Sequence, residues 1–377
     1  MEPFVTKQIL TYMGNKRKLI SHIEHIIVDI KNNLKKDTLV IADLFSGSGI
    51  VSRMFLSHSH CLLANDTALY SKILQDAYLF PLSKKDVNEL EHIISCMNAF
   101  VDSHECSFCV ETDGFISKHW SEGSKRLYYS RSNGIRIDLY RQYIDCYVPE
   151  KYKVYVLAPL LIESSIHTNT CGHFASFYKD GLGGKKSHDL TRITSPIRVS
   201  APIQPIKITP TRVVSSQMDA CEWAQGVKNP SVSIDVVYLD PPYNKHPYHI
   251  YYFLLNMIAK YDTTIDIPDT TRGQPRKWKQ SAYNSTVLAL KEFNRLISLL
   301  SCKYIIMSYS SRGILKKEQI ERILSKKGQV KCKTVSHGVY RRLEGLAHKH
   351  RITSSCSVSS KPQATEEYIW ICRVREE

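Results

Sequence analysis

Residues 238–243, Tyr-Leu-Asp-Pro-Pro-Tyr, constrain this chain more than any other part of its sequence. The apolar run 236–239 ends there in an acid, two prolines and a ring, which predicts a buried strand followed by a rigid turn. Ligands of open α/β sheets bind beyond the carboxyl ends of the strands. The Asp240 carboxylate, the Pro241 carbonyl and the Tyr243 ring are therefore candidates for one site. The alternative is an ordinary loop, because Asp-Pro and Pro-Pro are common turn sequences.

A planar base with an exocyclic amine fits this group of atoms. The amine can donate to Asp240 and to a backbone carbonyl while the base stacks on Tyr243. Enzymes that modify nucleobases hold an extruded base in this manner. The turn thus predicts a site for a nucleobase.

A second cluster, residues 39–53, has the pattern of a buried strand, an acid at its tip and a glycine turn that opens a helix. Gly47 and Gly49 allow the backbone to approach a ligand closely. A short strand near 61–65 leads into Asp66, the position where an acid binds a ribose diol. The third glycine of the dinucleotide fingerprint is missing and Asp43 would repel a pyrophosphate, so S-adenosylmethionine is a better ligand. Taken alone, the glycine turn is equally compatible with a structural role.

Together these elements resemble the DNA adenine-N6 methyltransferases whose cofactor motif precedes Asp-Pro-Pro-Tyr, the group of the Dam-like and many restriction-modification methylases. The resemblance spans most of the chain. Its elements, in family order, are Tyr12-Met-Gly-Asn-Lys16, Asp43-Leu-Phe-Ser-Gly-Ser-Gly49, Asn65-Asp66, Gln217-Met218-Asp219, Asp240-Pro-Pro-Tyr243 and the strand at 305–310.

The resemblance implies S-adenosyl-L-methionine as the cofactor, with Lys16 at its methionine carboxylate, Asp66 at its ribose and the segment containing Asp219 at its adenine. The full set of implied cofactor residues is Tyr12, Lys16, Asp43, Phe45, Gly47, Gly49, Asp66, Asp219 and Asp240. The implied catalytic residues are Asp240, Pro241 and Tyr243. Asp240 and the Pro241 carbonyl would each accept one N–H of the target amine, for direct methyl transfer without a metal.

The periodicity of apolar residues predicts an α/β fold with a doubly wound, mostly parallel sheet. Strands are expected at 39–43, 61–65, 211–215, 236–239 and 304–308. Helices are expected at 19–34, 49–58, 67–79, 249–259, 287–300 and 316–326. The resemblance implies a Rossmann-like S-adenosylmethionine-dependent methyltransferase fold, in which 330–334 and 367–372 close the sheet as a hairpin with one antiparallel strand. Residues 353–364 between them are predicted to be a flexible loop.

The alternation breaks between about 95 and 210, which predicts a catalytic domain of residues 1–95 and 210–377 with an insertion at 96–209. Residues 115–215 contain 15 Lys and Arg against 7 Asp and Glu. The resemblance implies that the insertion is a DNA target-recognition domain. Since phosphates attract Lys and Arg while base edges attract Arg and Asn, the candidate DNA contacts are Lys125, Arg126, Arg131, Asn133, Lys179, Lys185, Lys186, Arg276 and Trp278. The alternatives are that the aromatic residues of the insertion form its core and that the basic loop 271–279 is simply solvated.

The net charge of +15 and the pI of about 9.2 favour a polyanionic partner, here double-stranded DNA. No signal peptide or long apolar run is visible, so we expect a cytoplasmic protein without a membrane contact. Eleven scattered cysteines suit reduced thiols. His104, Cys106 and Cys109 lack a second matched pair of ligands, so no metal is expected.

The sequence therefore predicts a monomeric, site-specific, adenine-specific DNA-methyltransferase, the modification enzyme of a restriction-modification system. A separately encoded restriction endonuclease is the partner that this role implies. The alternatives are an RNA adenine methyltransferase and a catalytically silent DNA-binding subunit of the same fold. A cytosine-N4 enzyme is disfavoured because such enzymes tend to have Ser in place of Asp240, and a nicotinamide dehydrogenase is disfavoured by the incomplete glycine fingerprint.

Overall fold

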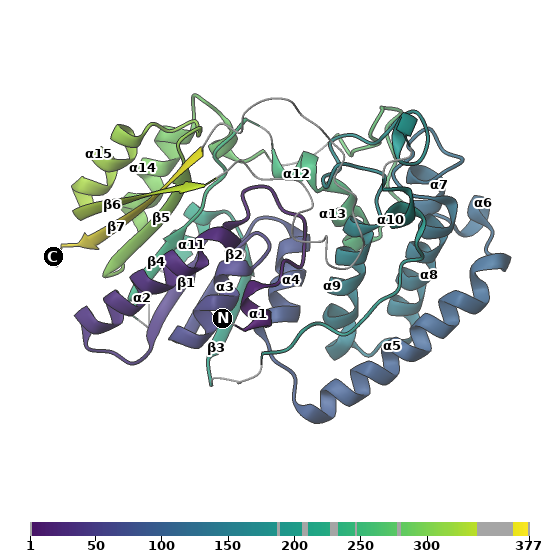
Figure 1. Cartoon of the computed structure of the whole chain (residues 1–377), viewed down its shortest axis with the longest axis horizontal. Coiled ribbons are helices and arrows are strands. Elements are labelled where there is room, and N and C mark those ends of the chain that lie inside the picture. The colour runs from purple at the N-terminus through teal and green to yellow at the C-terminus, as the bar shows by residue number, and fades with distance from the viewer. Residues whose placement is uncertain are drawn as a thin grey trace.

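The computed structural model describes residues 2–186, 189–205, 210–226, 233–245, 247–276, 280–337 and 365–375. Its centre is a seven-stranded sheet with the order β3-β2-β1-β4-β5-β7-β6 (Figure 1). The strands are β1 (Leu39–Asp43), β2 (Ser59–Asp66), β3 (Arg212–Gln217), β4 (Val236–Leu239), β5 (Tyr304–Ser310), β6 (Gly328–His337) and β7 (Thr365–Val374). All five strands expected from periodicity are present within a few residues of their predicted bounds.

Strands β1 to β5 are parallel to one another, whereas β7 lies antiparallel between β5 and β6. This confirms the predicted mostly parallel sheet with a C-terminal hairpin. The strand β4 pairs with both β1 and β5, so the turn that follows Leu239 leaves the middle of the sheet. The loop predicted at 353–364 lies outside the described residues.

Helices cover both faces of the sheet, as a doubly wound fold requires. Along β1, Leu39 and Ile41 face one apolar core while Val40 and Ala42 face the other, which is the two-residue period of a strand. The first core contains α2 (Ile20–Leu34), α3 (Ile50–Phe55) and α4 (Leu69–Leu79). The second contains α11 (Ala220–Gly226), α14 (Ala289–Leu299) and α15 (Lys317–Lys327).

A helical module lies beyond β3 at one end of the molecule (Figure 1). Its helices are α5 (Lys84–His104), α6 (Val110–Asp113), α7 (Ile116–Trp120), α8 (Arg131–Tyr147), α9 (Glu150–Ile166) and α10 (Leu190–Thr194). The predicted boundary at residue 96 falls inside α5, so the module begins no later than Lys84. Helix α9 packs on α4 and on α13 (Phe253–Lys260), and the buried residues of the module belong to the same core as α2 and α4.

The loop 261–276 packs on this module although it follows the Asp240–Tyr243 turn in sequence. Trp120 Nε1 donates to the Arg272 carbonyl at 2.8 Å, and the Tyr261 hydroxyl donates to Asp138 Oδ1 at 2.8 Å. Tyr128 and Tyr129 are fully buried, in agreement with the expectation that aromatic residues of the insertion form its core. The module is therefore built from two separate stretches of the chain.

Two details of the helices differ from expectation. The helix expected at 249–259 is two helices, α12 (Tyr248–Tyr251) and α13, separated at Tyr252, whose φ of −126° and ψ of 19° are not helical. A short helix α1 (Pro3–Thr6) precedes a 3-10 turn at Lys16–Leu19 that leads into α2. Because Tyr252 turns the chain, α12 lies across the carboxyl edge of the sheet.

Candidate active site

A cavity of about 290 Å³ lies at the carboxyl edge of the sheet, between the ends of β1, β2 and β4. Residues that follow these three strands meet because β1 lies between β2 and β4. Helix α12 and the segment 280–284 form the opposite wall. Of the cofactor residues implied by the resemblance, the lining contains Tyr12, Phe45, Asp66, Asp219 and Asp240.

Asp240 directly follows β4 and lines the cavity with 18% of its side chain exposed. Pro241 is buried and Pro242 lines the cavity, so the turn has two fixed φ angles. The Tyr243 carbonyl accepts the N–H of Ile314 at 2.9 Å, and the Tyr243 ring meets Tyr309 edge to face with 6.0 Å between the centroids. The turn is therefore held from both its backbone and its aromatic side chain.

Asp240 is half of a buried ion pair. Lys16 Nζ lies 3.0 Å from Asp240 Oδ1 and 2.6 Å from Glu367 Oε1, with Lys16 4% and Glu367 6% exposed. Burial raises the pKa of Asp240, Lys16 opposes this rise and Glu367 adds to it, giving a pKa of about 6. Burial alone would lower the pKa of Lys16, but the two carboxylates raise it well above its usual value. At neutral pH the site therefore holds a carboxylate beside an ammonium.

The glycine turn brings the end of β1 against Tyr12 and Asp66. Gly47 and Gly49 have φ angles of 52° and 74°, in the left-handed region that favours glycine. The Gly47 N–H donates to Asp66 Oδ2 at 2.8 Å. A Cβ at Gly47 would lie 2.7 Å from Tyr12 Cε1, whereas a Cβ at Gly49 would meet no atom within 4 Å. Gly47 is thus required for close packing as well as for its backbone angle.

Asp66 and Asp43 end two neighbouring strands but have different surroundings. Asp66 lines the cavity, and its Oδ1 accepts the Ala68 N–H at 2.9 Å. Burial raises the pKa of Asp66, against the opposing effect of its backbone N–H donors. Asp43 is fully buried, its Oδ2 accepts the Ser52 hydroxyl at 2.5 Å, and burial with the nearby Asp240 charge raises its pKa to about 7. Asp66 therefore faces the cavity, while Asp43 is buried and connects the end of β1 to α3 through Ser52.

Tyrosines form one wall of the cavity. The Tyr12 ring stacks on Tyr252 with 4.9 Å between centroids and lies 5.2 Å from the Tyr248 ring. Its hydroxyl is 3.2 Å from that of Tyr70. Burial raises the pKa of Tyr12 well above its usual value, so the wall is neutral at physiological pH. It offers flat rings and hydroxyl groups to a planar ligand.

Another part of the lining carries Phe45 and Tyr283, whose rings meet edge to face with 5.3 Å between the centroids. The buried Tyr283 hydroxyl makes no hydrogen bond with any described residue. At the rim, Asp219 Oδ1 accepts the Cys221 N–H at 2.9 Å and so caps α11. This part of the cavity therefore offers the Phe45–Tyr283 ring pair, the Asp219 carboxylate and the Tyr283 hydroxyl, which has no hydrogen-bond partner among the described residues.

Sequence reasoning missed several residues of this site. Glu367 has a sequence signal, because it is an acid directly before the apolar residues 368–370 of the last strand. The sequence does not indicate that it pairs with Lys16. Tyr70, Tyr248 and Tyr283 carried no signal that separates them from the other tyrosines of the chain. Their position in the cavity depends on how distant elements pack.

The proposed DNA contacts divide into exposed and buried side chains. Arg126 is 7% exposed, and it donates to the carbonyls of Pro268 at 2.8 Å and Thr270 at 3.0 Å. Asn133 is fully buried, and its amide hydrogen-bonds to the backbone of Ile193, Ser195 and Ile197. These two side chains hold the module together and are not presented to a ligand, which corrects the expectation that they contact DNA.

The exposed members of the set are Lys125, Arg131, Lys179, Lys185 and Arg276. Lys125 pairs with Asp269 at 3.1 Å, with both side chains 78% exposed. The side chain of Lys186 and the whole of Trp278 lie outside the described residues. The expectation of DNA contact is therefore kept for the five exposed cations.

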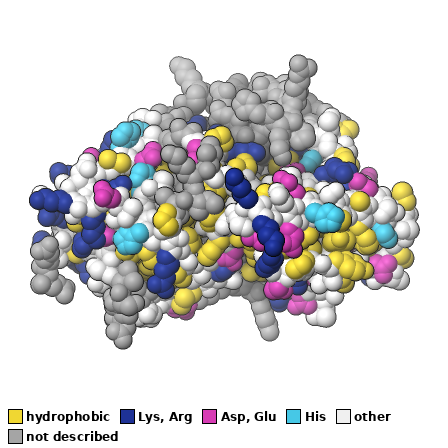
Figure 2. All heavy atoms as spheres, turned by 90° about the horizontal axis from the view of Figure 1, so that it is seen from below, with side chains coloured by type: hydrophobic (Ala, Val, Ile, Leu, Met, Phe, Trp, Pro, Cys, Tyr) yellow, Lys and Arg dark blue, Asp and Glu magenta, His cyan; other side chains and the backbone are white. Residues whose placement is uncertain are grey.

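A groove of about 620 Å³ lies between the segments 175–179 and 270–276. Its lining includes Lys179, Arg272 and Arg276, and also Ile250 of α12. Because α12 also supplies Tyr248 to the cavity, the groove and the cavity lie on two sides of one short helix. On the underside, opposite this edge, the visible cations are mixed with acidic and apolar side chains (Figure 2).

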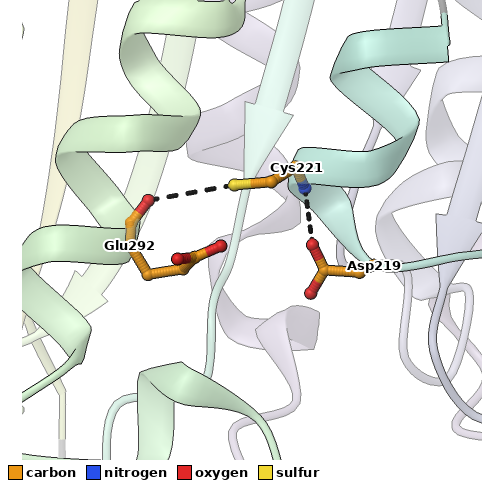
Figure 3. A group of neighbouring side chains, drawn as sticks. All are labelled: Asp219, Cys221 and Glu292. Carbon is orange, nitrogen blue, oxygen red and sulfur yellow. Dashed lines mark hydrogen bonds between the residues drawn. The ribbon is translucent and has the colours of Figure 1, made fainter.

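Within the described part of the chain, side chains that could jointly hold a metal ion gather at Asp219, Cys221 and Glu292 (Figure 3). Asp219 caps α11, and Arg295 Nη1 lies 3.4 Å from Glu292 Oε1. Burial, together with Glu292 and Asp219, raises the pKa of the Cys221 thiol to about 12, so Cys221 is protonated rather than a thiolate ligand at neutral pH. These contacts give each group a structural role.

Cys106 and Cys109 are exposed free thiols. Together with His104 they do not form a metal-binding group among the residues that the structure describes. No helix in the described ranges has both the length and the apolar character needed to span a membrane.

Comparison with known proteins agrees with this geometry. The M.NlaIII type II methyltransferase of Neisseria lactamica is 27% identical over 373 residues, which cover 96% of this chain and 98% of the relative. The M.CviAII type II methyltransferase of Paramecium bursaria Chlorella virus 1 is 28% identical over 328 residues, 86% of this chain and 90% of the relative. The M.FokI type II methyltransferase of Planomicrobium okeanokoites is 28% identical over 356 residues, and the chain spans about half of its length (51%).

The model of one protein family, described as D12 class N6 adenine-specific DNA methyltransferase, matches residues 12–323. The matched range begins at Tyr12 and includes the glycine turn, Asp66, Asp219 and the Asp240–Tyr243 turn. It favours neither an RNA methyltransferase nor a silent subunit. The chain belongs to the D12 class N6 adenine-specific DNA methyltransferase family and is an adenine-specific DNA-methyltransferase.

Proposed function

We propose that this enzyme transfers the methyl group of S-adenosyl-L-methionine to the N6 amine of an adenine extruded from duplex DNA, as the modification enzyme of a restriction-modification system. The observation that carries the proposal is the position of Asp240 at the wall of a cavity that it shares with Asp66 and Asp219. The names of the relatives, type II methyltransferases and modification methylases, support the restriction-modification role.

The donor set of the cavity fits this cofactor. Three carboxylates, Asp66, Asp219 and Asp240, line the cavity, and none of the described Lys or Arg residues does. A cationic sulfonium suits such a lining better than a pyrophosphate does. The Tyr283 hydroxyl, buried without a hydrogen-bond partner, is a further group awaiting a polar ligand. When bound, the cofactor supplies a methyl group on a positive sulfur.

The residues of the cavity divide the work of binding. Asp66 would accept the ribose hydroxyls of the bound cofactor, and Phe45 and Asp219, which also line the cavity, would hold its adenine. Tyr12, Tyr70 and Tyr248, which line the same cavity, would supply aromatic contacts to the cofactor. Lys16 remains the candidate for the methionine carboxylate only through its remaining N–H, because its ammonium already faces Asp240 and Glu367. Gly47 acts indirectly, through its N–H on Asp66.

Catalysis depends on positioning the target amine. The adenine amine is a poor nucleophile because its lone pair is delocalised into the ring. Asp240 and the Pro241 carbonyl each accept one of its N–H groups and hold the nitrogen in a more tetrahedral form, while Tyr243 stacks on the base. Since the pKa of Asp240 is about 6, its carboxylate is available at pH 7.5 and is lost progressively below pH 6.

The basic groove supplies a path for the DNA strand beside the cavity. Lys179, Arg272 and Arg276 favour phosphates, and the groove leads to α12, which borders the cavity. Lys125, Arg131 and Lys185 extend the same positive character over the exposed surface of the helical module. The recognised sequence depends on which of these side chains reach base edges.

The test uses purified enzyme, radiolabelled S-adenosylmethionine and unmethylated genomic DNA, followed by digestion and identification of the labelled nucleoside. We expect label in N6-methyladenine. Label only in RNA supplied in parallel, or no label with the cofactor still bound, would refute the proposal.

The role of Asp240 is tested with Asp240→Asn and Asp240→Ala. Both should abolish methyl transfer and leave DNA binding largely intact, because the groove does not include Asp240. The control is Asp37→Asn, an exposed carboxylate before β1 that should not change activity. Strong residual turnover of Asp240→Ala would contradict the assignment.

A cognate restriction endonuclease encoded separately is the partner that we propose for this enzyme. A monomeric state and a cytoplasmic location stay predictions of the same kind. Sizing of the purified protein with and without DNA tests the first, and fractionation of the source cells tests the second.

A further inference from the structure

Glu367 is a buried carboxylate that none of the motifs includes. It lies on β7, opposite Ser310 of β5, and is 4% exposed. Its Oε1 accepts Lys16 Nζ at 2.6 Å, across 351 positions of the sequence. The N-terminal segment and the C-terminal hairpin thus meet beside the catalytic turn through one ion pair.

The distances show how the charge of Lys16 is shared. Nζ lies closer to Glu367 Oε1, at 2.6 Å, than to Asp240 Oδ1, at 3.0 Å. The ammonium also lies 5.3 Å from the centroid of the Tyr243 ring, so it contacts two of the four residues of the catalytic turn. A buried ammonium held by Glu367 therefore has little freedom to move toward the cavity.

This sharing matters for the acceptor capacity of Asp240. An ionised carboxylate can accept about four hydrogen bonds, and Lys16 Nζ lies 3.0 Å from Asp240 Oδ1 as an ion pair without hydrogen-bond geometry, so this oxygen has no hydrogen-bond partner among the described residues. If Lys16 were released from Glu367, its full charge would fall on Asp240 and its N–H donors would compete with the target amine. With Glu367 in place, the lone pairs of Asp240 stay open to the substrate, and its carboxylate is ionised at pH 7.5 because its pKa is about 6.

We propose that Glu367 is a positioning residue for methyl transfer, which holds Lys16 so that Asp240 remains available to the target amine. Glu367 does not line the cavity and acts through Lys16. The inference rests on the proposed catalytic role of Asp240. It adds to that role a requirement for the last strand of the sheet.

Several charged and titratable groups surround Asp240. Across the elements packed against it, the groups that interact with Asp240 are Lys16, Glu367, Ser308, Asp43, Tyr238, Tyr243, Tyr248 and Tyr309. Burial raises the pKa of each of these tyrosines, so they stay neutral over the range in which Asp240 titrates. Asp43 and Glu367 are the other acids in this set.

The decisive variant is Glu367→Gln, which keeps the size of the side chain and an oxygen for Lys16 but removes the charge. We expect kcat at pH 7.5 to fall at least tenfold, with the KM values for cofactor and DNA within about threefold of wild type. The acid limb of the kcat profile should shift to lower pH, because Glu367 raises the pKa of Asp240 and its loss lowers it.

The adjacent Glu366 provides a matched control. It is exposed on the same strand, and its Oε2 accepts the Tyr368 hydroxyl at 3.2 Å. Glu366→Gln removes the same charge one residue away and should leave kcat and the pH profile unchanged. An equal loss in both variants would overturn the proposal, since it would come from the strand and not from the ion pair.

A double-mutant cycle separates positioning from stability. If Glu367 acts through Lys16, then adding Glu367→Gln to Lys16→Gln should change kcat by less than twofold. Additive losses would refute the proposal. The double variant remains useful if Glu367→Gln alone folds poorly. It removes both the Lys16 ammonium and the Glu367 carboxylate, so neither charge is left buried without the other. If Glu367→Gln keeps its kcat while Asp240→Asn is inactive, the proposal for Glu367 is rejected and the catalytic role of Asp240 stands. If Asp240→Asn is active, the catalytic role of Asp240 is itself rejected.

Discussion

Replacing Gly47 by Ala tests whether the glycine turn and the tyrosine wall are one unit. The new Cβ would lie 2.7 Å from Tyr12 Cε1 and 3.1 Å from Tyr12 Cζ, closer than packed carbon atoms approach. Tyr12 cannot simply rotate away, because its ring stacks on Tyr252 and its hydroxyl lies 3.2 Å from that of Tyr70. The substitution must therefore move the ring or the turn.

The chain contains a control for the backbone effect. Gly49 has a φ of 74°, close to the 52° of Gly47, but a Cβ there meets nothing within 4 Å. A non-glycine residue in the left-handed region costs about 1–2 kcal/mol. Gly49→Ala should lower the free energy of unfolding by about that amount and no more.

Gly47→Ala adds overpacking to the same backbone cost. Forcing extra atoms into a packed region costs about 1–3 kcal/mol, so the total loss should be about 2–5 kcal/mol. Cofactor affinity should fall about tenfold, ~1.4 kcal/mol, the size of one displaced aromatic contact. In Gly49→Ala the affinity should change less.

Urea unfolding gives the free energies, and calorimetry with S-adenosylmethionine gives the affinities. Adding Gly47→Ala to Tyr12→Ala should cost only the backbone term, because the clashing ring is gone. If Gly47→Ala and Gly49→Ala proved equally stable and bound the cofactor equally well, the packing of Tyr12 on Gly47 would not be what shapes this wall.

Three further predictions concern other parts of the molecule. Asp235→Asn should destabilise the protein by about 2 kcal/mol, because the buried carboxylate accepts bonds from two lysine ammonium groups at 2.8 and 2.9 Å and from a backbone N–H. Burial would raise the pKa of Asp235, but these donors lower it below its usual value, so its stabilising effect exists above about pH 4 and is lost as the pH falls further; urea midpoints of the variant should lack this dependence. Arg276→Ala should weaken DNA binding similarly for all sequences and reduce the slope of log K against log salt by about 1, as fluorescence anisotropy can show. Cys221 should resist iodoacetamide at pH 8 while the exposed Cys146 reacts, because burial raises the pKa of Cys221 to about 12; mass spectrometry that finds Cys221 alkylated in the native protein would contradict its buried position.

The strands and turns around the candidate site could be predicted from local sequence. The strands at 39–43 and 236–239, the glycine turn and the acid after the second strand all have short-range signals, and the structure places Asp66, Asp219 and Asp240 around one cavity. Parallel strands run in the same direction, so their carboxyl ends lie at one edge of the sheet. The strand order then decides which of these ends are neighbours. These three residues come together because each lies at, or just after, the carboxyl end of a strand.

The helical module was predicted less well. Its extent was predicted as residues 96–209 from the break in alternation, and Arg126 and Asn133 were assigned to DNA because their residue types suit DNA. In the structure their side chains hydrogen-bond to backbone carbonyl and N–H groups of distant loops. Sequence cannot distinguish an arginine that binds phosphate from one that binds buried carbonyls, since both need only hydrogen-bond acceptors.

The sequence by itself therefore determined the fold class, the glycine turn at 43–49 and the Asp240–Tyr243 turn, because each turn depends on residues within one strand and the segment that follows it. Tertiary structure alone decided that Glu367 meets Lys16 and that four tyrosines form a wall. It also decided that the loop 261–276 joins the helical module. These contacts connect segments far apart in the chain, and they exist only after the sheet order and the packing of the helices have brought the segments together.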